Sequence, residues 1–113
     1  MSHRLEKINK MLLREISSFI SREGLLENGL ITITYVKCSA DLKNATVGIS
    51  VLPEKLAGTA LKILSSASGR LAKELNKKLK IKFIPKFNWE IDSLERNAIA
   101  IERALAELKN NEN

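Results

Sequence analysis

Two consecutive stretches rich in β-branched residues, 30–37 and 45–51, constrain the fold of this chain more than any other feature. In the first stretch isoleucine alternates with threonine up to Tyr35, and in the second apolar residues alternate with polar ones. A period of two is typical of a half-buried β-strand, in which successive side chains point to opposite faces. A polar segment, 41–44, separates the two stretches and is suited to a turn. We therefore expect a β-hairpin.

Helical periodicity occurs on both sides of this hairpin. Apolar residues recur every three or four positions over 4–23, and Gly24 ends the pattern. A second helix is predicted to start at Pro53, whose fixed φ suits the first turn, and its apolar positions extend to Leu79. The segment 65–69, Ser-Ser-Ala-Ser-Gly, should kink or break this helix, because serine competes for backbone hydrogen bonds and glycine loosens the backbone.

A third strand and a last helix are predicted in the remaining part of the chain. The strand is interrupted or started at Pro85. Its apolar residues all occupy odd-numbered positions and would face the core: Ile81, Phe83, Phe87, Trp89 and Ile91. Asp92 and Glu95 have the spacing of a capping box and precede the apolar stripe of a terminal helix. The predicted order is helix, strand, strand, kinked helix, strand and helix. This is an α+β fold whose open three-stranded sheet is covered by helices on one face.

The composition excludes several classes of protein. A length of 113 residues fits a single domain over residues 1–113. No apolar run approaches the roughly 18 residues of a membrane span, and the N-terminus lacks the apolar segment of a secretion signal. Cys38 is the only cysteine and His3 the only histidine, which argues against internal disulfides, histidine-based triads, zinc clusters and redox pairs. We expect a cytoplasmic protein that is not an enzyme, with no catalytic residues, metal or cofactor.

Positive charge is concentrated in the middle of the chain, over residues 53–87. The net charge is +6, from 19 basic against 13 acidic residues, and the single acid Glu74 accompanies seven cations within 70–86. These cations are Arg70, Lys73, Lys77, Lys78, Lys80, Lys82 and Lys86. Clustered cations attract phosphate backbones through counterion release, so the cluster is predicted to bind RNA. Lys80 and Lys82 are favoured, because strand alternation would hold both on the polar face.

This basic cluster has two other interpretations. A solvated helix surface is the ordinary alternative for a lysine-rich segment. A membrane surface is disfavoured as a partner, because the neighbouring apolar residues fit a core-facing stripe and no exposed aromatic row accompanies them.

Several short motifs occur in a characteristic order along nearly the whole chain. They are Val36, Ser39, Asp41, Leu42 and Ala45, then Ala67-Ser68-Gly69-Arg70, then Leu75, then Pro85-Lys86-Phe87-Asn88-Trp89 and Asp92. In this order and spacing they resemble the ribosome-binding factor A family. The resemblance implies a KH-like fold of type II, in which a helix kink at Ala67-Ser68-Gly69 replaces the Gly-x-x-Gly loop of ordinary KH domains.

The same resemblance implies a function. The protein would bind the free immature small (30S) ribosomal subunit and assist late maturation and processing of its ribosomal RNA. The apolar stripes are accounted for by one core, so we expect a monomer. It would take part in cold adaptation and have no enzymatic activity. Two alternatives remain open: a KH-type module that binds other structured RNAs, and a protein-interaction module whose basic face docks on an acidic partner.

The kink and some flanking residues have further interpretations. The kink is expected to expose the N-terminus of the second half-helix, where free N–H groups and Arg70 would meet a phosphate; close helix packing by small residues is the alternative. Trp89 is assigned to the core, because it shares parity with Phe87. Four cations on the polar side of the first helix are interpreted as solvated surface: Arg4, Lys7, Lys10 and Arg14.

Overall fold

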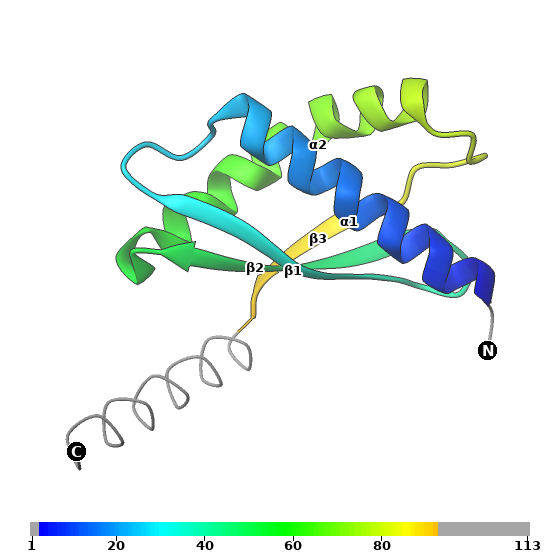
Figure 1. Ribbon diagram of the computed structural model, residues 1–113, viewed down its shortest axis with the longest axis horizontal. Helices are drawn as coiled ribbons and strands as arrows, with labels where there is room; N and C mark the ends of the chain where they lie inside the picture. The colour runs from blue at the N-terminus through cyan, green and yellow to red at the C-terminus, as the bar shows by residue number, and fades with distance from the viewer. Residues whose placement is uncertain (1–2, 93–113) are drawn as a thin grey trace, which may run out of the picture.

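The computed structural model describes residues 3–92, which form two long helices and a three-stranded sheet (Figure 1). The elements are α1 (His3–Glu23), β1 (Leu30–Cys38), β2 (Asn44–Leu52), the short 3₁₀ helix η1 (Glu54–Leu56), α2 (Ala57–Lys78) and β3 (Lys86–Ile91). The predicted α+β class is confirmed. The helix predicted after Asp92 lies outside the described residues. No helix within residues 3–92 is long and apolar enough to cross a membrane.

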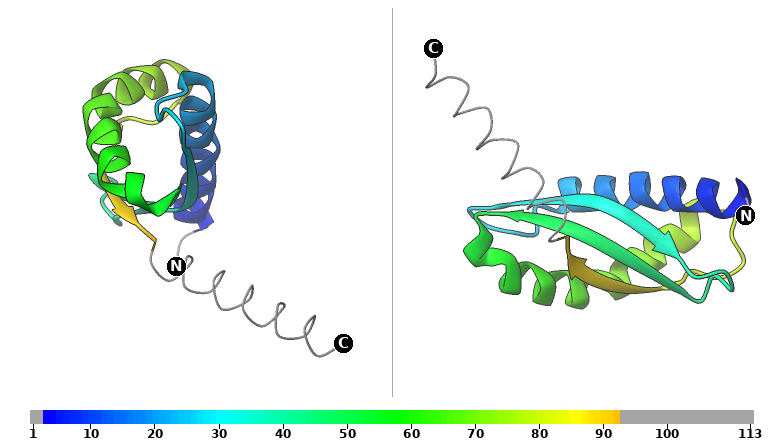
Figure 2. Two further views of the ribbon diagram at one scale, coloured as in Figure 1. Left: turned by 90° about the vertical axis from the view of Figure 1, so that its left-hand side faces the viewer. Right: turned by 90° about the horizontal axis from the view of Figure 1, so that it is seen from below.

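The central strand of the sheet is β2. It pairs with β1 in the antiparallel direction, from Leu30 opposite Leu52 to Cys38 opposite Ala45, so the predicted hairpin is confirmed. β3 pairs with the other edge of β2 in the parallel direction, and a parallel pair requires a crossover, which α2 provides. Figures 1 and 2 show both helices on the same face of the sheet, as predicted.

The core fills the space between the sheet and the two helices. Buried residues recur every three or four positions in each helix and at every second position in β2, the spacings that place side chains on one face. They are Ile8, Leu12, Ile16, Phe19 and Ile20 in α1, Ala45, Val47, Ile49 and Val51 in β2, and Ala60, Leu64, Ala67, Leu71 and Leu75 in α2. Each buried leucine or isoleucine contributes roughly 1.5–3 kcal/mol, so this layer fixes the helices on the sheet.

A β-bulge between Ile33 and Tyr35 interrupts the regular pairing of β1 and was not predicted. The extra residue lets Ile33 and Val36 both pack against the core, although their positions differ in parity. It also turns Tyr35 to the outer face of the sheet. There the tyrosine ring lies over Gly48 of β2, and its hydroxyl donates a hydrogen bond to the carboxylate of Glu90 on β3. Tyr35 thus connects all three strands.

Pro53 is not the first residue of α2, contrary to the prediction. Its ψ of 155° is extended, and its carbonyl accepts a hydrogen bond from the Leu56 N–H at 3.0 Å. This bond closes the turn of η1, and α2 begins only at Ala57. An extended ψ cannot continue a helix, so the proline stands before the first turn instead of inside it.

Of the kink or break predicted in the second helix, the break does not occur, because α2 is uninterrupted from Ala57 to Lys78. The Ser68 hydroxyl donates a hydrogen bond to the Leu64 carbonyl at 2.9 Å, and Gly69 has no positive φ. Back-bonding of this kind often bends a helix without breaking it. The axis of α2 changes direction midway along the helix (Figure 2), so the small residues accompany a bend in a continuous helix.

Residues 79–85 connect α2 to β3 and form no part of the strand. Pro85 has no N–H to donate to β2, which explains why the strand starts after it. The pairing begins with the Lys86 N–H, which donates to the Lys43 carbonyl at 2.9 Å.

This connector corrects the predictions made for Lys80, Lys82 and Phe83. Lys80 and Lys82 lie in it, so strand alternation does not determine where their side chains point. Phe83, predicted to face the core from the strand, has 69% of its surface exposed. Parity is meaningful only within a regular strand, and the apolar alternation before Pro85 belongs to an irregular segment.

Candidate nucleic-acid interface

The seven cations predicted to bind RNA differ in their surroundings. The structure divides them into four groups: Arg70 and Lys78 paired with carboxylates, Lys73 and Lys77 exposed on α2, Lys80 and Lys82 in the connector, and Lys86 on β3. RNA contact by any of them stays a prediction, and the geometry differs from group to group.

Arg70 lies between the two helices. Its Nη1 is 2.7 Å from Glu23 Oε1, and its guanidinium carbon is 5.9 Å from the centre of the Phe19 ring. Because α2 is continuous, there is no second helix N-terminus here, and the free N–H groups predicted beside Arg70 do not occur. The arginine therefore links α1 to α2 in this structure.

Neighbouring ion pairs extend the same contact between helices. Arg22 Nη2 donates to both carboxylate oxygens of Glu74, at 2.6 and 2.5 Å, and this hydrogen bond lowers the pKa of Glu74. Lys78 Nζ lies 3.8 Å from Glu15 and 3.9 Å from Glu74. Arg22 and Glu74 are 52 positions apart, so the periodicity of either helix cannot reveal their contact.

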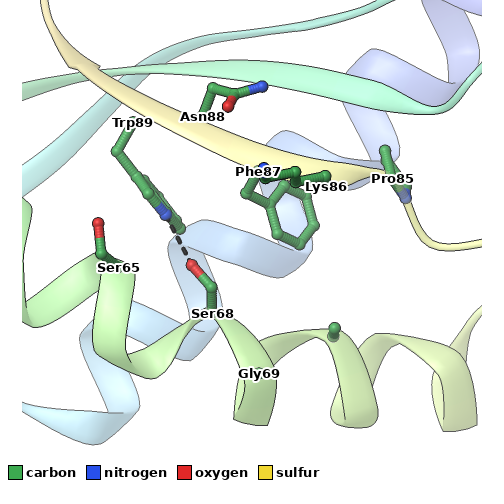
Figure 3. A pocket seen from close by; sticks show the side chains of 9 residues that line it. Ser65, Ser68, Gly69, Pro85, Lys86, Phe87, Asn88 and Trp89 are labelled. Atoms are coloured by element: carbon green, nitrogen blue, oxygen red, sulfur yellow. Dashed lines mark hydrogen bonds between the residues drawn. The ribbon is translucent and has the colours of Figure 1, made fainter.

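A groove of about 540 Å³ lies between α2 and β3, at the bend of the helix (Figure 3). This α2–β3 groove is lined by Ser65, Ser68, Gly69 and Ala72 on one side and by residues 85–89 on the other. It brings together three residues of the predicted site: Ser68, Gly69 and Lys86. The third member of the kink motif, Ala67, is only 4% exposed and belongs to the core.

Trp89 forms one wall of the α2–β3 groove. Its indole Nε1 donates a hydrogen bond to Ser68 Oγ at 2.8 Å, the contact drawn in Figure 3, and that hydroxyl donates onward to the Leu64 carbonyl. The indole also packs against Phe87, with ring centres 6.0 Å apart. Trp89 contacts the core, as predicted, but it is half-buried and also shapes the groove, which parity alone could not indicate.

A second groove, of about 730 Å³, lies where the start of α1, the β1–β2 turn and the connector meet. This connector groove is lined by Arg4, Lys7, Ile8, Met11, Asp41, Leu42, Lys80, Ile81, Lys82 and Phe83. Arg4 and Lys7, which the sequence assigned to solvated surface, therefore border the same hollow as Lys80 and Lys82. Lys10 and Arg14 do not line it and are exposed on α1.

Asp41 is the one acidic residue among those that line the connector groove within residues 3–92. Its Oδ1 accepts hydrogen bonds from the Ser39 hydroxyl at 2.6 Å and from the Lys43 N–H at 3.0 Å. These two bonds lower the pKa of Asp41. The carboxylate thus stabilises the β1–β2 turn, and the groove keeps a strong excess of positive charge.

Cys38 ends β1, and its thiol is buried. Burial raises the pKa of this thiol, so the reactive thiolate is disfavoured. Within residues 3–92, no group of three or more histidine, cysteine, aspartate or glutamate side chains is arranged to hold a metal ion.

Comparison with known proteins identifies close sequence relatives. The family model described as ribosome-binding factor A matches residues 4–105. The chain is 35% identical over 112 residues to ribosome-binding factor A of Pseudomonas fluorescens, covering 92% of this chain and 84% of the relative. It is also 35% identical over 99 residues to the Acetivibrio thermocellus protein of that name, covering 84% of this chain and 80% of the relative.

Solved structures show the same fold. The crystal structure of ribosome-binding factor A from Thermus thermophilus aligns with a TM-score of 0.68 and 22% identity, covering 77% of this chain and 94% of that one. A second set of Thermus thermophilus coordinates, fitted into the cryo-EM map of a complex with the 30S subunit, aligns with a TM-score of 0.59 and 24% identity, covering 73% and 88%. The architecture is therefore the one that the sequence resemblance implied.

Proposed function

Because this chain belongs to the ribosome-binding factor A family, we propose that it binds the free immature small (30S) ribosomal subunit and assists late maturation and processing of its ribosomal RNA. The partner is supported by the 30S complex described for the Thermus thermophilus relative. The protein acts in the bacterial cytoplasm, as a monomer, by binding RNA and without catalysis of its own.

One observation carries the assignment to RNA: the unpaired Lys86 lines the α2–β3 groove, and two further unpaired lysines, Lys73 and Lys77, follow its lining residue Gly69 along α2. Lys86 lines the groove from β3, and Gly69 lines it from α2. Lys73 and Lys77 follow Gly69 at intervals of four residues, which places the three residues in a row along α2. Within residues 3–92, no carboxylate lies within ion-pairing distance of Lys73, Lys77 or Lys86.

This row suits the phosphate backbone of structured RNA. Lysine ammonium groups act as point charges that displace counterions from phosphates without reading the bases. Their spacing is fixed, because Leu71 and Leu75 anchor this part of α2 in the core, with 1% and 0% of their surface exposed. At Gly69 an added Cβ would meet no atom within 4 Å, so the helix backbone is open to an approaching strand.

Sedimentation through a sucrose gradient tests the proposed function. The protein should travel with free small subunits at low salt, be absent from assembled ribosomes and dissociate as the salt concentration rises. The double variant Lys73→Glu with Lys77→Glu should bind subunits more weakly. It should also reduce the slope of log affinity against log salt by about 2, because each lost phosphate contact removes about 0.9.

A matched control keeps the same change of charge outside both grooves. Lys37→Glu with Lys55→Glu alters exposed lysines of β1 and η1, and it should retain nearly the wild-type slope. A wild-type protein that remains at the top of the gradient at every salt concentration would overturn the proposal. Tighter binding to isolated structured RNA than to subunits would favour a KH-type module that acts on other RNAs.

A further inference from the structure

The connector groove combines positive charge with an exposed aromatic ring. Phe83 stands at this groove with 69% of its surface exposed, and the Lys82 ammonium lies 5.5 Å from the centre of its ring. Phe83 is not among the residues that pack against the core, and most of its surface stays in water, so the hydrophobic effect stabilises it little in this position. A ring held in this position is available to stack on a flat ligand.

The cations around this ring lack partners of opposite charge. Among residues 3–92, no carboxylate lies within ion-pairing distance of Arg4, Lys7, Lys80 or Lys82. The nearest acid in the groove, Asp41, is already engaged by the Ser39 hydroxyl and the Lys43 N–H. Four like charges that share one hollow repel each other, and a polyanion relieves this repulsion.

Three separate parts of the chain build the groove. Arg4 and Lys7 come from the first turns of α1, Asp41 and Leu42 from the β1–β2 turn, and Lys80–Phe83 from the connector. Figure 1 shows these three parts at the same end of the molecule. The site is distinct from the α2–β3 groove, because the two hollows share no lining residue.

We propose that the connector groove binds an unpaired nucleotide of single-stranded RNA, with the base stacked on Phe83 and the flanking phosphates held by Arg4, Lys7, Lys80 and Lys82. Stacking requires a base that has left its helix, so unpaired RNA fits the ring better than a duplex does. An acidic peptide would use the cations but leave the ring without a role. The inference relies on the proposed function only for ribosomal RNA as the source of the nucleotide.

Fluorescence anisotropy with two labelled RNAs tests this site: single-stranded decauridine and a hairpin of ten base pairs whose stem is closed by a polyethylene glycol linker, so that it has no unpaired nucleotide. Phe83→Leu keeps an apolar side chain but removes the aromatic face. It should weaken decauridine binding about tenfold, which lies within the usual effect of losing one stacked base, and leave the salt slope unchanged. Hairpin binding should change little.

The charge variant should behave in the opposite way. Lys80→Gln with Lys82→Gln should reduce the salt slope for decauridine by about 1.4, since each phosphate contact on a single strand contributes about 0.7. Two controls match these changes. Leu30→Ala alters another exposed apolar residue, 60% exposed on β1, and Lys37→Gln with Lys55→Gln removes two exposed lysines outside the groove. Both controls should bind decauridine like the wild type.

Three results would overturn the proposal: wild-type affinity of Phe83→Leu for decauridine, equal weakening of decauridine and hairpin by that variant, or tighter binding of polyglutamate than of decauridine. Sedimentation separates this proposal from the proposed function. If the wild type travels with small subunits while Phe83→Leu binds decauridine normally, only the nucleotide site fails. If Phe83→Leu loses decauridine affinity while the wild type does not travel with subunits, only the ribosomal function fails.

Discussion

Replacing Gly69 with alanine separates the part this residue plays in the helix from its part in the α2–β3 groove. Gly69 is exposed within α2, has no positive φ, and has space for a Cβ, since no atom lies within 4 Å of that position. Glycine in a helix interior is about 1 kcal/mol less favourable than alanine. Gly69→Ala should therefore raise the free energy of unfolding by about 1 kcal/mol, which corresponds to a rise in Tm of about 4 °C for a domain of this size.

The measurement is urea unfolding followed by far-UV circular dichroism, with the slope against urea held constant between variants. Gly58→Ala is the matched control. Gly58 is exposed in the first turn of the same helix, an added Cβ there also meets no atom within 4 Å, and it does not line the α2–β3 groove. Both variants should be more stable than the wild type.

Binding should distinguish the two glycines. A methyl group on Gly69 stands where a phosphate strand would approach α2, so Gly69→Ala should bind small subunits more weakly while it folds more tightly. Gly58→Ala should gain stability with no loss of binding. A loss of stability in Gly69→Ala would refute the argument that the bend tolerates a side chain, and unchanged binding would show that RNA does not approach this backbone.

Three further changes test the contacts of the sheet. Gly48→Ala should destabilise the protein by about 1 kcal/mol, because the added methyl displaces the Tyr35 ring. In a protein that already carries Tyr35→Ala, the same change should stabilise the fold by about 0.5 kcal/mol, and urea unfolding of this double-mutant cycle measures both effects. The hydrogen bond to Glu90 raises the pKa of Tyr35 from 10.0 to about 12. The stability that this hydrogen bond contributes is therefore complete below pH 10 and is lost as the pH rises towards 12. Tyr35→Phe should remove this alkaline fall in Tm. Ser68→Ala should cost about 0.5 kcal/mol, because losing the acceptor of the Trp89 indole outweighs the better helix propensity of alanine, and it should shift the fluorescence emission of this single tryptophan.

Sequence could predict those parts of the fold in which the spacing of apolar residues along one helix or strand directly shows which side chains are buried. Ile8, Leu12 and Ile16 are spaced by four residues, and all three are buried on one face of α1. Val47 and Ile49 alternate in β2, and neither has any exposed surface. In both cases one regular element faces one core, so no information from distant residues is needed.

Prediction failed where the backbone departs from a regular period. The bulge in β1 does leave a signal, because Ile31 and Ile33 occupy odd positions whereas Val36 and Cys38 occupy even ones, and all four contact one core. Only an extra residue reconciles the two parities. For Phe83 the signal was misleading, since its alternation with lysines belongs to the irregular connector.

The candidate site was harder to predict than the fold, because its residues meet only in three dimensions. Sequence could identify a basic cluster, but it could not show that Arg4 and Lys7 lie beside Lys80 and Lys82, or that Arg70 faces Glu23. The charge that is available to RNA therefore differs from the charge counted along the chain.

This difference leads to a last prediction, which concerns two cations three positions apart on α2. Arg70 already has a carboxylate partner, whereas Lys73 has none within residues 3–92. A paired cation must give up its partner before it can neutralise a phosphate, so it adds little to counterion release. Lys73→Gln should therefore lower the salt slope for subunit binding by about 0.9, while Arg70→Gln should leave the slope unchanged.

Titration of subunit binding across a series of salt concentrations measures both slopes. Glu23→Gln completes the comparison, because it frees Arg70 without removing its charge and should steepen the slope if the guanidinium then reaches RNA. An equal fall in slope for Arg70→Gln and Lys73→Gln would show that the pair with Glu23 opens on the ribosome. In that case Arg70 would pair with Glu23 only in the free protein. All seven cations counted in the sequence, and not only those without a carboxylate partner, would then be available to RNA in the bound state.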